Sequence, residues 1–309
     1  MTTVVLLAAD TTLLAQLQAA FARQAPELRV VLADDPAALH AQVAACWHPP
    51  AHSLERLPAL QLVHSVAAGV DHLHSDSSRP DVPVCRVVDP DHRRGMTEYV
   101  RWAVLHFHRD FDRVTAQQRE NRWQRHPQRP AGQFKVGVMG LGSLGAAIAD
   151  DLANASYAVR GWARSARQLP GVGCHHGDDQ FDGFLDGLDM LINLLPLTDA
   201  TRGILCSRTF AALAPGAAIV NGGRGQHLRI DDLEQALVSG QLRGAVLDVF
   251  EHEPLSADDR LWQMPGVIVT PHMASAASHD CIARQVAENA RRLLSGEPLN
   301  NLVDPTLGY

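Results

Sequence analysis

Residues 134–145 read Phe-Lys-Val-Gly-Val-Met-Gly-Leu-Gly-Ser-Leu-Gly, and a helical pattern follows them to residue 154. Gly140, Gly142 and Gly145 have the Gly-x-Gly-x-x-Gly spacing between a predicted strand and a predicted helix. A second apolar strand is predicted at residues 157–162. A strand, a glycine-rich turn, a helix and a second strand within about thirty residues are typical of a dinucleotide-binding unit. A tight strand-to-helix turn without a ligand is the alternative.

Each glycine of this turn has a distinct expected role. Gly140 permits the tight turn out of the strand, and Gly142 lets backbone N–H groups approach a pyrophosphate. Gly145 lets the helix lie close to the sheet. The N-terminus of the helix would then face the anion with the positive end of its dipole.

The residues after the second strand predict the choice of cofactor. An NAD-type site carries Asp or Glu there, about 20 residues past the glycines, to bind the ribose 2′-hydroxyl. Residues 157–168 contain no carboxylate and instead include Arg164, Ser165 and Arg167. Two guanidinium groups and a hydroxyl can surround a 2′-phosphate. The sequence therefore predicts NADPH as the cofactor, and a solvated basic loop is the alternative.

Length and composition indicate an ordinary soluble globular protein. The chain has 309 residues, enough for two domains, with 46% hydrophobic and 20% charged residues. The formal net charge of −7 argues against a nucleic-acid or anionic-membrane partner. No apolar run approaches the ~20 residues of a membrane span, and the first residues lack signal-peptide features.

The cysteines and histidines predict a cytoplasmic protein without a metal site. Five scattered cysteines without a Cys-x-x-Cys pair are typical of reduced thiols. The sixteen histidines show no His-Glu-x-x-His or similar spacing, so structural or solvated roles are expected for them.

The first hundred residues alternate between predicted strands and helices. Strands are expected at 4–8, 28–32, 44–47 and 61–65, and helices at 11–24 and 36–42. This order implies a parallel sheet of its own, with ligands beyond the carboxyl ends of the strands. Trp47 and the turn at Ala68 and Gly69 then lie at a candidate site. Gly69 either exposes backbone N–H groups to a carboxylate or is a plain turn glycine.

Alternation resumes after a long connection. Residues 94–119 form one long helical pattern, and the polar stretch to residue 130 is either a linker or a dimer-contacting arm. Further strands are expected at 189–195, 217–221, 244–249 and 267–270, and a closing helix at 276–295.

Three polar residues each follow a strand of this second sheet, namely Arg224, Glu253 and His272. The carboxyl edge of a parallel sheet carries the ligand, so we expect them to share one site. Arg offers a planar fork to a carboxylate, His can protonate a forming alkoxide, and a Glu behind the His orients it. This set predicts keto-acid reduction beside a nicotinamide. Singly, a surface Arg, a loop Glu and a capping His are the alternatives.

Several stretches carry a resemblance to a known family. They are 67–73 (Ala-Ala-Gly-Val-Asp-His-Leu), 140–145, 195–198 with 201–203, 221–225 (Asn-Gly-Gly-Arg-Gly), 247–250 with 253–255, and 270–272 (Thr-Pro-His). Along nearly its whole length the chain resembles the D-2-hydroxyacid dehydrogenase family. Residues 47–50, 95–99, 162–165 and the tail from 296 are most similar to its glyoxylate/hydroxypyruvate reductase A group.

The resemblance implies the fold and the domain boundaries. It implies two doubly wound parallel-sheet domains, a Rossmann cofactor domain at 98–283 and a flavodoxin-like substrate domain made of 1–97 with 284–309. It also implies a catalytic cleft between the domains and a homodimer formed through the cofactor domain.

The resemblance also implies roles for single residues. Arg224 would bind the substrate, His272 would be the acid/base and Glu253 its partner, whereas Ala68 and Gly69 would bind the substrate carboxylate. Trp47 is our hypothesis for a wall that keeps the substrate small. The remaining expected cofactor contacts are Ser143, Leu144, Leu195, Pro196, Gly222, Gly223 and Asp248. Among these, Asp248 would hold the nicotinamide carboxamide. Gly223 departs from the family, because many relatives have alanine or serine there.

The resulting prediction is NADPH-dependent reduction of a small 2-keto acid, such as glyoxylate or hydroxypyruvate, to the D-2-hydroxy acid. The carboxylate at 253 argues against formate dehydrogenases of this superfamily, which pair the histidine with glutamine. Two alternatives stay open: an NAD-dependent relative for a larger acid, and a redox-sensing binding protein that keeps the fold without turnover.

Overall fold

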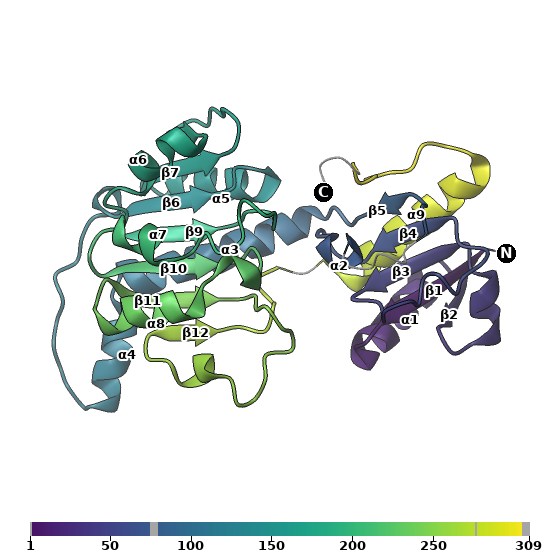
Figure 1. Ribbon diagram of the computed structural model, residues 1–309, viewed down its shortest axis with the longest axis horizontal. Helices are drawn as coiled ribbons and strands as arrows, with labels where there is room; N and C mark the ends of the chain where they lie inside the picture. The colour runs from purple at the N-terminus through teal and green to yellow at the C-terminus, as the bar shows by residue number, and fades with distance from the viewer. Residues whose placement is uncertain (1, 75–79, 276, 305–309) are drawn as a thin grey trace. The chain divides into compact units, whose positions relative to one another are not determined.

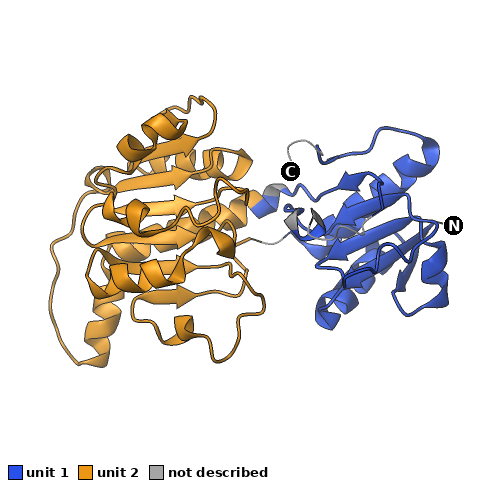
Figure 2. Ribbon diagram, viewed as in Figure 1, with its two compact units in different colours: residues 1–92, 276–309 blue, residues 93–275 orange. Residues whose placement is uncertain are grey.

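The computed structural model describes residues 2–74, 80–275 and 277–304, and it forms two compact units (Figure 2). Unit 1 comprises residues 1–92 and 276–309, and unit 2 comprises residues 93–275. The sequence placed these boundaries at 97/98 and 283/284, and the second of these would divide helix α9 (His279–Ser295).

Unit 1 contains a five-stranded parallel sheet in the order β2-β1-β3-β4-β5 (Figure 1). This is the flavodoxin-like strand order. The strands are β1 (Thr3–Ala8), β2 (Arg29–Leu32), β3 (Val43–Trp47), β4 (Leu62–Ser65) and β5 (Val84–Cys85). The sequence predicted the first four and missed β5, which has only two residues.

Helices cover both faces of this sheet because its strands are apolar on both sides. Leu6 and Leu62 face α1 (Thr11–Gln24) and α9, which supply Phe21 and Val286 to the same core. The opposite face packs against the 3-10 helix η1 (Pro36–His40), the segment 54–60 and the short helix α2 (Asp71–His74).

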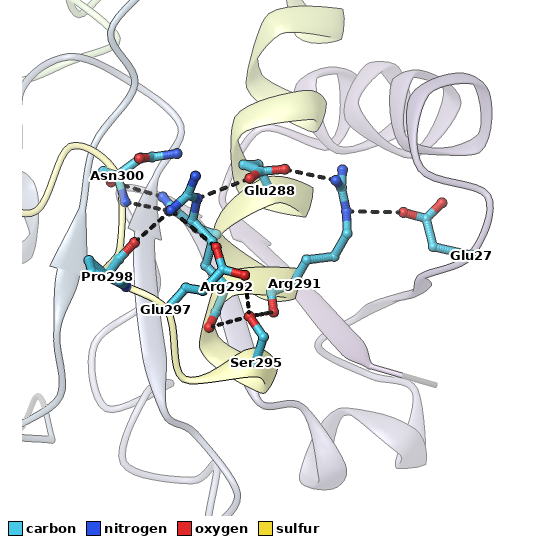
Figure 3. A network of polar contacts seen from close by, with 9 residues as sticks. Glu27, Glu288, Arg291, Arg292, Ser295, Glu297, Pro298 and Asn300 are labelled. Carbon is cyan, nitrogen blue, oxygen red and sulfur yellow. Dashed lines mark hydrogen bonds and ion pairs between the residues drawn. The ribbon is translucent and has the colours of Figure 1, made fainter.

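Residues 297–300 are bound to α9 by a network of polar contacts within unit 1 (Figure 3). Helix α9 ends at Ser295 and is capped by Gly296, whose φ of 70° is left-handed. Arg292 donates to Glu288 at 2.9 Å and to the carbonyl oxygen of Pro298 at 3.1 Å. These contacts fold the returning tail along the last turns of the helix.

Unit 2 contains a seven-stranded parallel sheet in the order β12-β11-β10-β9-β6-β7-β8. The strands are β6 (Lys135–Met139), β7 (Ala158–Ala163), β8 (Val172–His176), β9 (Met190–Asn193), β10 (Ala217–Asn221), β11 (Leu242–Leu247) and β12 (Val267–Val269). The order reverses between β6 and β9, which is the Rossmann topology with its switch point. The expected fold class, two doubly wound parallel-sheet domains, is thereby confirmed.

Both faces of the second sheet are buried as well. Helices α3 (Pro90–His108) and α5 (Ser143–Asn154) cover one face, where Phe107 and Ile148 join the core. Helices α6 (Phe181–Leu185), α7 (Ser207–Ala211) and α8 (Ile230–Val238) cover the other, with Phe184, Phe210 and Leu233.

The single helix predicted at 94–119 is wrong, because it consists of α3 and α4 (Phe111–Arg119). The break lies at Asp110, whose φ of 56° ends the α-helical path. Arg243 stabilises the break by donating to Asp110 Oδ1 at 2.7 Å and by lying over the Phe107 ring. A cation from a distant strand decides where the helix turns, and helical periodicity does not report it.

Smaller corrections concern ends of elements. The strand predicted at 189–195 ends at Asn193, and the helix predicted at 276–295 begins at His279. The Ser278 hydroxyl caps that helix by accepting from the Cys281 N–H. Residue 276 itself lies outside the described residues. The sequence did not predict β8, which adds a seventh strand beside β7.

Candidate active site

The glycine-rich turn joins β6 to α5, and its geometry requires glycine at two positions. Gly140 has a φ of 96°, which side chains rarely adopt. A Cβ at Gly145 would lie 1.8 Å from the Gly140 carbonyl oxygen. A Cβ at Gly142 would meet no described atom within 4 Å, and its φ of −74° is ordinary. The open space at Gly142 is what close approach of a ligand to the backbone requires.

Helix α5 presents its N-terminus to this space. Gly142 is the N-cap residue, and no side chain of the described chain caps the helix. Ser143 is exposed and Leu144 is half-buried in the first turn. The first N–H groups of the helix and the positive end of its dipole are therefore available to an anion such as a pyrophosphate.

The loops that carry the expected catalytic residues share one edge of the second sheet. Asn221, Leu247 and Val269 end β10, β11 and β12, and Leu247 is the register partner of both of the others. Arg224 and His272 each follow their strand by three residues. The parallel register therefore brings these loops to the same edge, as the sequence predicted.

The same edge continues to the glycine-rich turn. Asn193 ends β9 between Asn221 of β10 and Met139 of β6. Leu195 and Pro196 follow Asn193 and lie at the switch point of the sheet. The expected cofactor contacts at Leu195 and Pro196 thus lie just past the end of β9, the strand next to β6 and its Gly-x-Gly-x-x-Gly turn.

His272 and Glu253 form a hydrogen-bonded pair. His272 Nδ1 lies 2.7 Å from Glu253 Oε2, and the two side chains keep 30% and 26% of their exposure. Glu253 is held in turn, because its Oε1 accepts from the Phe250 N–H at 2.9 Å. With Nδ1 engaged by the carboxylate, Nε2 is the nitrogen of His272 that can exchange a proton with a ligand.

Asp248 directs its carboxylate toward the loop that carries His272. Its Oδ1 accepts from the Thr270 hydroxyl at 2.6 Å and from the Met273 N–H at 2.9 Å, and its Oδ2 accepts from the Ala274 N–H at 2.9 Å. Burial raises the pKa of Asp248, and these hydrogen bonds oppose that rise. The structure thus gives Asp248 a role in fixing the His272 loop, and its expected contact to a nicotinamide carboxamide stays a prediction.

The Arg224 loop rests on a buried polar network that sequence reasoning missed. Arg224 Nη1 donates to the Gly223 carbonyl oxygen at 2.7 Å. Beneath it, Asn193, Asn221 and His227 are fully buried, and Asn193 is hydrogen-bonded to both of the others. The available signal was an Asn at the last position of two apolar strands, with a His three residues after the arginine.

The same network leaves little room for a side chain at Gly223, the position where the chain departs from the family. A Cβ there would lie 2.8 Å from His227 Nδ1 and 2.9 Å from Asn193 Nδ2. A larger residue at this position therefore requires the loop and the network to shift together. Gly222, beside it, is half-buried and has more room, because a Cβ there would lie 3.3 Å from Leu194 Cδ2.

The basic loop expected to bind a 2′-phosphate directly follows β7. Arg164, Ser165 and Arg167 are all exposed. Strand β8, next to β7, adds His176, which is the register partner of Ala163. The loop therefore presents two guanidinium groups and a hydroxyl at the carboxyl edge, and the 2′-phosphate contact stays a prediction.

The loop of unit 1 at Ala68 and Gly69 is expected to bind the substrate carboxylate, and its own carbonyl groups accept hydrogen bonds from other parts of unit 1. Ser65 Oγ donates to the Gly69 carbonyl oxygen at 2.8 Å, and Arg86 Nη1 donates to that of Ala68 at 3.4 Å. The N–H groups of Ala68 and Gly69 form no hydrogen bond within the described part of the chain. The loop therefore offers donors, as a carboxylate site requires.

Trp47 ends β3 within a cluster of three rings. Its centroid lies 4.7 Å from that of His48 and 4.9 Å from that of His72. The two histidine rings are 5.1 Å apart. Trp47 is therefore held from two sides at the carboxyl end of its strand, and the two histidines are residues that sequence reasoning missed.

Metal-binding clusters and membrane-spanning helices are both absent from the described residues. No group of three or more His, Cys, Asp or Glu within residues 2–74, 80–275 and 277–304 is placed to hold a metal ion. No described helix is both long and apolar enough to cross a membrane.

Known proteins match the chain along its length. The family model "D-isomer specific 2-hydroxyacid dehydrogenase, NAD binding domain" matches residues 101–274. Glyoxylate/hydroxypyruvate reductase A of Serratia proteamaculans is 39% identical over 275 residues, covering 87% of this chain and 88% of the relative.

Solved structures agree. A D-isomer specific 2-hydroxyacid dehydrogenase family protein from Klebsiella pneumoniae is 50% identical, with a TM-score of 0.93 over 98% of this chain and 97% of the other. The NADPH-dependent glyoxylate/hydroxypyruvate reductase from Sinorhizobium meliloti, in complex with NADP and sulfate, is 35% identical, with a TM-score of 0.92 over 100% of both chains. The resemblance drawn from the sequence is confirmed, and this chain belongs to the D-isomer specific 2-hydroxyacid dehydrogenase family.

Proposed function

We propose that this chain reduces small 2-keto acids, with glyoxylate and hydroxypyruvate as substrates, to D-2-hydroxy acids by using NADPH. The observation that carries the proposal is the His272–Glu253 pair, 2.7 Å apart, on the sheet edge that also carries Arg224 and the glycine-rich turn. Relatives named as glyoxylate/hydroxypyruvate reductases support the substrate class.

The residues of the carboxyl edge fit a dinucleotide. The open space at Gly142, the uncapped N-terminus of α5 and the loop at Leu195 and Pro196 suit a pyrophosphate with its sugars. When bound, the reduced nicotinamide supplies the hydride that reaches the carbonyl carbon. Relatives crystallised with NADPH or NADP support this cofactor.

The chain's own residues bind the substrate and move the proton. The Arg224 guanidinium binds the carboxylate and polarises the carbonyl oxygen. Binding of the carboxylate by the N–H groups of Ala68 and Gly69 stays a prediction of the family resemblance. His272 donates its Nε2 proton to the forming alkoxide oxygen. Glu253 stabilises the imidazolium through Nδ1 and fixes the ring orientation.

A steady-state screen tests the proposal. Glyoxylate, hydroxypyruvate, pyruvate and phenylpyruvate are each assayed with NADPH and with NADH. We expect the highest kcat/KM for glyoxylate or hydroxypyruvate with NADPH, because we assign Trp47 as a bulky residue that limits the size of the substrate. Phenylpyruvate with NADH as the best pair would indicate a dehydrogenase for a larger acid. Cofactor binding without turnover of any acid would indicate a redox-sensing binding protein.

The basic loop after β7 is assigned to the 2′-phosphate of NADPH. Arg164, Ser165 and Arg167 are exposed there, and residues 157–168 contain no carboxylate. We expect a preference for NADPH over NADH of at least about tenfold in kcat/KM, or some 1.4 kcal/mol. Arg164→Ala should weaken NADPH much more than NADH, and Arg208→Ala, an exposed arginine on α7, is the matched control. Equal losses for both cofactors would contradict the assignment.

We further infer a homodimer and a cytoplasmic location. Large hydrophobic side chains are exposed on α3, on α4 and in the segment after α4: Trp102, Leu105, Phe111, Val114 and Trp123. Such a concentration supports an interface with a second copy. The five cysteines are all free thiols, which supports a reducing compartment.

A further inference from the structure

His227 lies at the centre of the buried network beneath the Arg224 loop. It is fully buried, on the 3-10 turn η4 (Gly225–His227) that follows β10. Its ring contacts the backbone of two different loops. Nδ1 lies 3.0 Å from the Arg224 backbone nitrogen, and Nε2 lies 3.3 Å from the Pro196 carbonyl oxygen.

The hydrogen-bond pattern assigns the tautomer of this histidine. The Arg224 N–H can only donate, so Nδ1 accepts and carries no proton. The Pro196 carbonyl oxygen can only accept, so Nε2 carries the proton. The neutral Nε2–H form thus satisfies both loops at once, and neither the other tautomer nor imidazolium does.

Two asparagines complete the network on either side of the ring. Asn193 donates to His227 Nδ1 at 2.9 Å and to Asn221 Oδ1 at 2.9 Å. Asn221 then donates to the Arg224 carbonyl oxygen at 3.0 Å. The peptide groups on both sides of the Arg224 Cα are therefore fixed by side chains that are themselves buried and hydrogen-bonded.

We propose that His227 is a positioning residue that couples the Arg224 loop, which is assigned to the substrate, to the Pro196 loop, which is assigned to the cofactor. Its Nδ1 fixes the backbone from which the Arg224 guanidinium projects, and its Nε2 fixes Pro196 in the loop assigned to the cofactor. This inference rests on the proposed function of Arg224 and Pro196. A rigid support matters because displacement of a binding group by about 1 Å can cost on the order of a hundredfold in rate.

The two ring nitrogens can be tested separately with two amides. In His227→Asn the amide reaches the position of Nδ1, so its oxygen can accept from the Arg224 N–H, but nothing reaches Pro196. In His227→Gln the amide reaches the position of Nε2, so its NH2 can donate to the Pro196 carbonyl oxygen, but the acceptor for Arg224 is lost. Gln226→Ala, on the same turn, is the control because its half-buried side chain forms no hydrogen bond in the described structure.

The proposal predicts opposite effects in the two variants. His227→Asn should raise the Kd of NADPH, measured by reduced-nicotinamide fluorescence, by about five- to tenfold and leave the KM of glyoxylate nearly unchanged. His227→Gln should leave the Kd of NADPH nearly unchanged and raise the KM of glyoxylate or lower kcat by at least that factor. Urea unfolding of both variants measures the loss of stability. A merely structural role would lower the stability without separating the effect on the Kd of NADPH from the effect on glyoxylate kinetics.

Several outcomes would overturn the proposal. Equal changes in the Kd of NADPH and the KM of glyoxylate in both variants would reduce His227 to a structural residue, and so would native kinetics in His227→Gln. If the wild-type chain turns over no 2-keto acid, the proposed function fails. The fluorescence titration then still tests the contact to Pro196 by itself. A native Kd of NADPH in His227→Asn would show that this contact does not support cofactor binding.

Discussion

His272 has a φ of 51°, a left-handed conformation that is uncommon for a residue other than glycine. The surrounding backbone holds it there, because the His272 N–H donates to the Asp248 carbonyl oxygen at 2.9 Å. The Asp248 carboxylate binds the next two N–H groups along the loop. A strained backbone that is fixed from several sides orients the imidazole toward Glu253.

Replacing His272 tests its role as the general acid. His272→Ala should lower kcat by roughly 10²–10⁴, the range for a lost acid/base group. The Kd of NADPH should stay near that of the wild type, because the glycine-rich turn and α5 are untouched. Single-turnover rates and fluorescence titration measure the two quantities. Exposed His252 provides the control variant His252→Ala, and near-native turnover in His272→Ala would place the acid elsewhere.

Arg224 tests whether geometry or charge binds the substrate. Arg224→Lys keeps the charge but replaces a planar fork with a point charge, so kcat/KM for glyoxylate should fall by at least about a hundredfold. The variant also loses the hydrogen bond that Arg224 Nη1 donates to the Gly223 carbonyl oxygen, 2.7 Å long in the wild-type chain. Steady-state kinetics at saturating NADPH measure the change. A small rise in KM with unchanged kcat would argue against bidentate binding.

At the scale of the element, β4 carries a buried histidine that no ligand explains. His64 is fully buried, and its Nδ1 donates to the Ser65 carbonyl oxygen at 2.8 Å. Its Nε2 has no hydrogen-bond partner among the described residues. Burial lowers the pKa of His64 from 6.5 to about 4. In the folded chain the His64 ring is therefore neutral at any pH well above 4.

This depressed pKa predicts acid sensitivity. Between pH 6.5 and about 4 the unfolded chain binds a proton at residue 64 and the folded chain does not, so stability falls as the pH falls through this window. The loss reaches roughly 3 kcal/mol by pH 4 and is absent above pH 6.5. Urea unfolding across this range should show a weaker pH dependence in His64→Asn than in the wild type. Parallel pH profiles of the two proteins would contradict the assignment.

At the scale of the whole molecule, the inferred homodimer depends on the exposed apolar side chains of the α3–α4 region. Trp123 is 95% exposed, which is costly for an isolated chain and typical of an interface anchor. We expect sedimentation to give twice the chain mass of 33.5 kDa. Trp123→Glu should weaken the dimer by more than about tenfold.

The matched control for the dimer is Val238→Glu on α8, where an 86% exposed valine lies outside the α3–α4 region. This variant should keep the mass of the wild type. A monomeric wild-type chain would refute the homodimer, and a dimer that Trp123→Glu leaves intact would place the interface elsewhere.

The sequence by itself determined the fold class and the sheet edge on which the loops of the candidate site lie. Apolar strands alternating with helical patterns require parallel sheets, and parallel sheets carry their loops at one edge. The expected positions of Gly140, Arg224 and His272 after strands followed from this local logic. Local patterns sufficed because strand periodicity, turn glycines and strand ends depend on near neighbours.

Only the tertiary structure decided the features that depend on distant residues. Arg243 breaks the helix at Asp110, Asp248 fixes the His272 loop, and His227 joins the loops after β9 and β10. Each of these side chains binds a group that lies far away in the sequence. A hydrogen bond of this kind is not visible in the sequence pattern, because its partners come together and are buried only when the chain has folded.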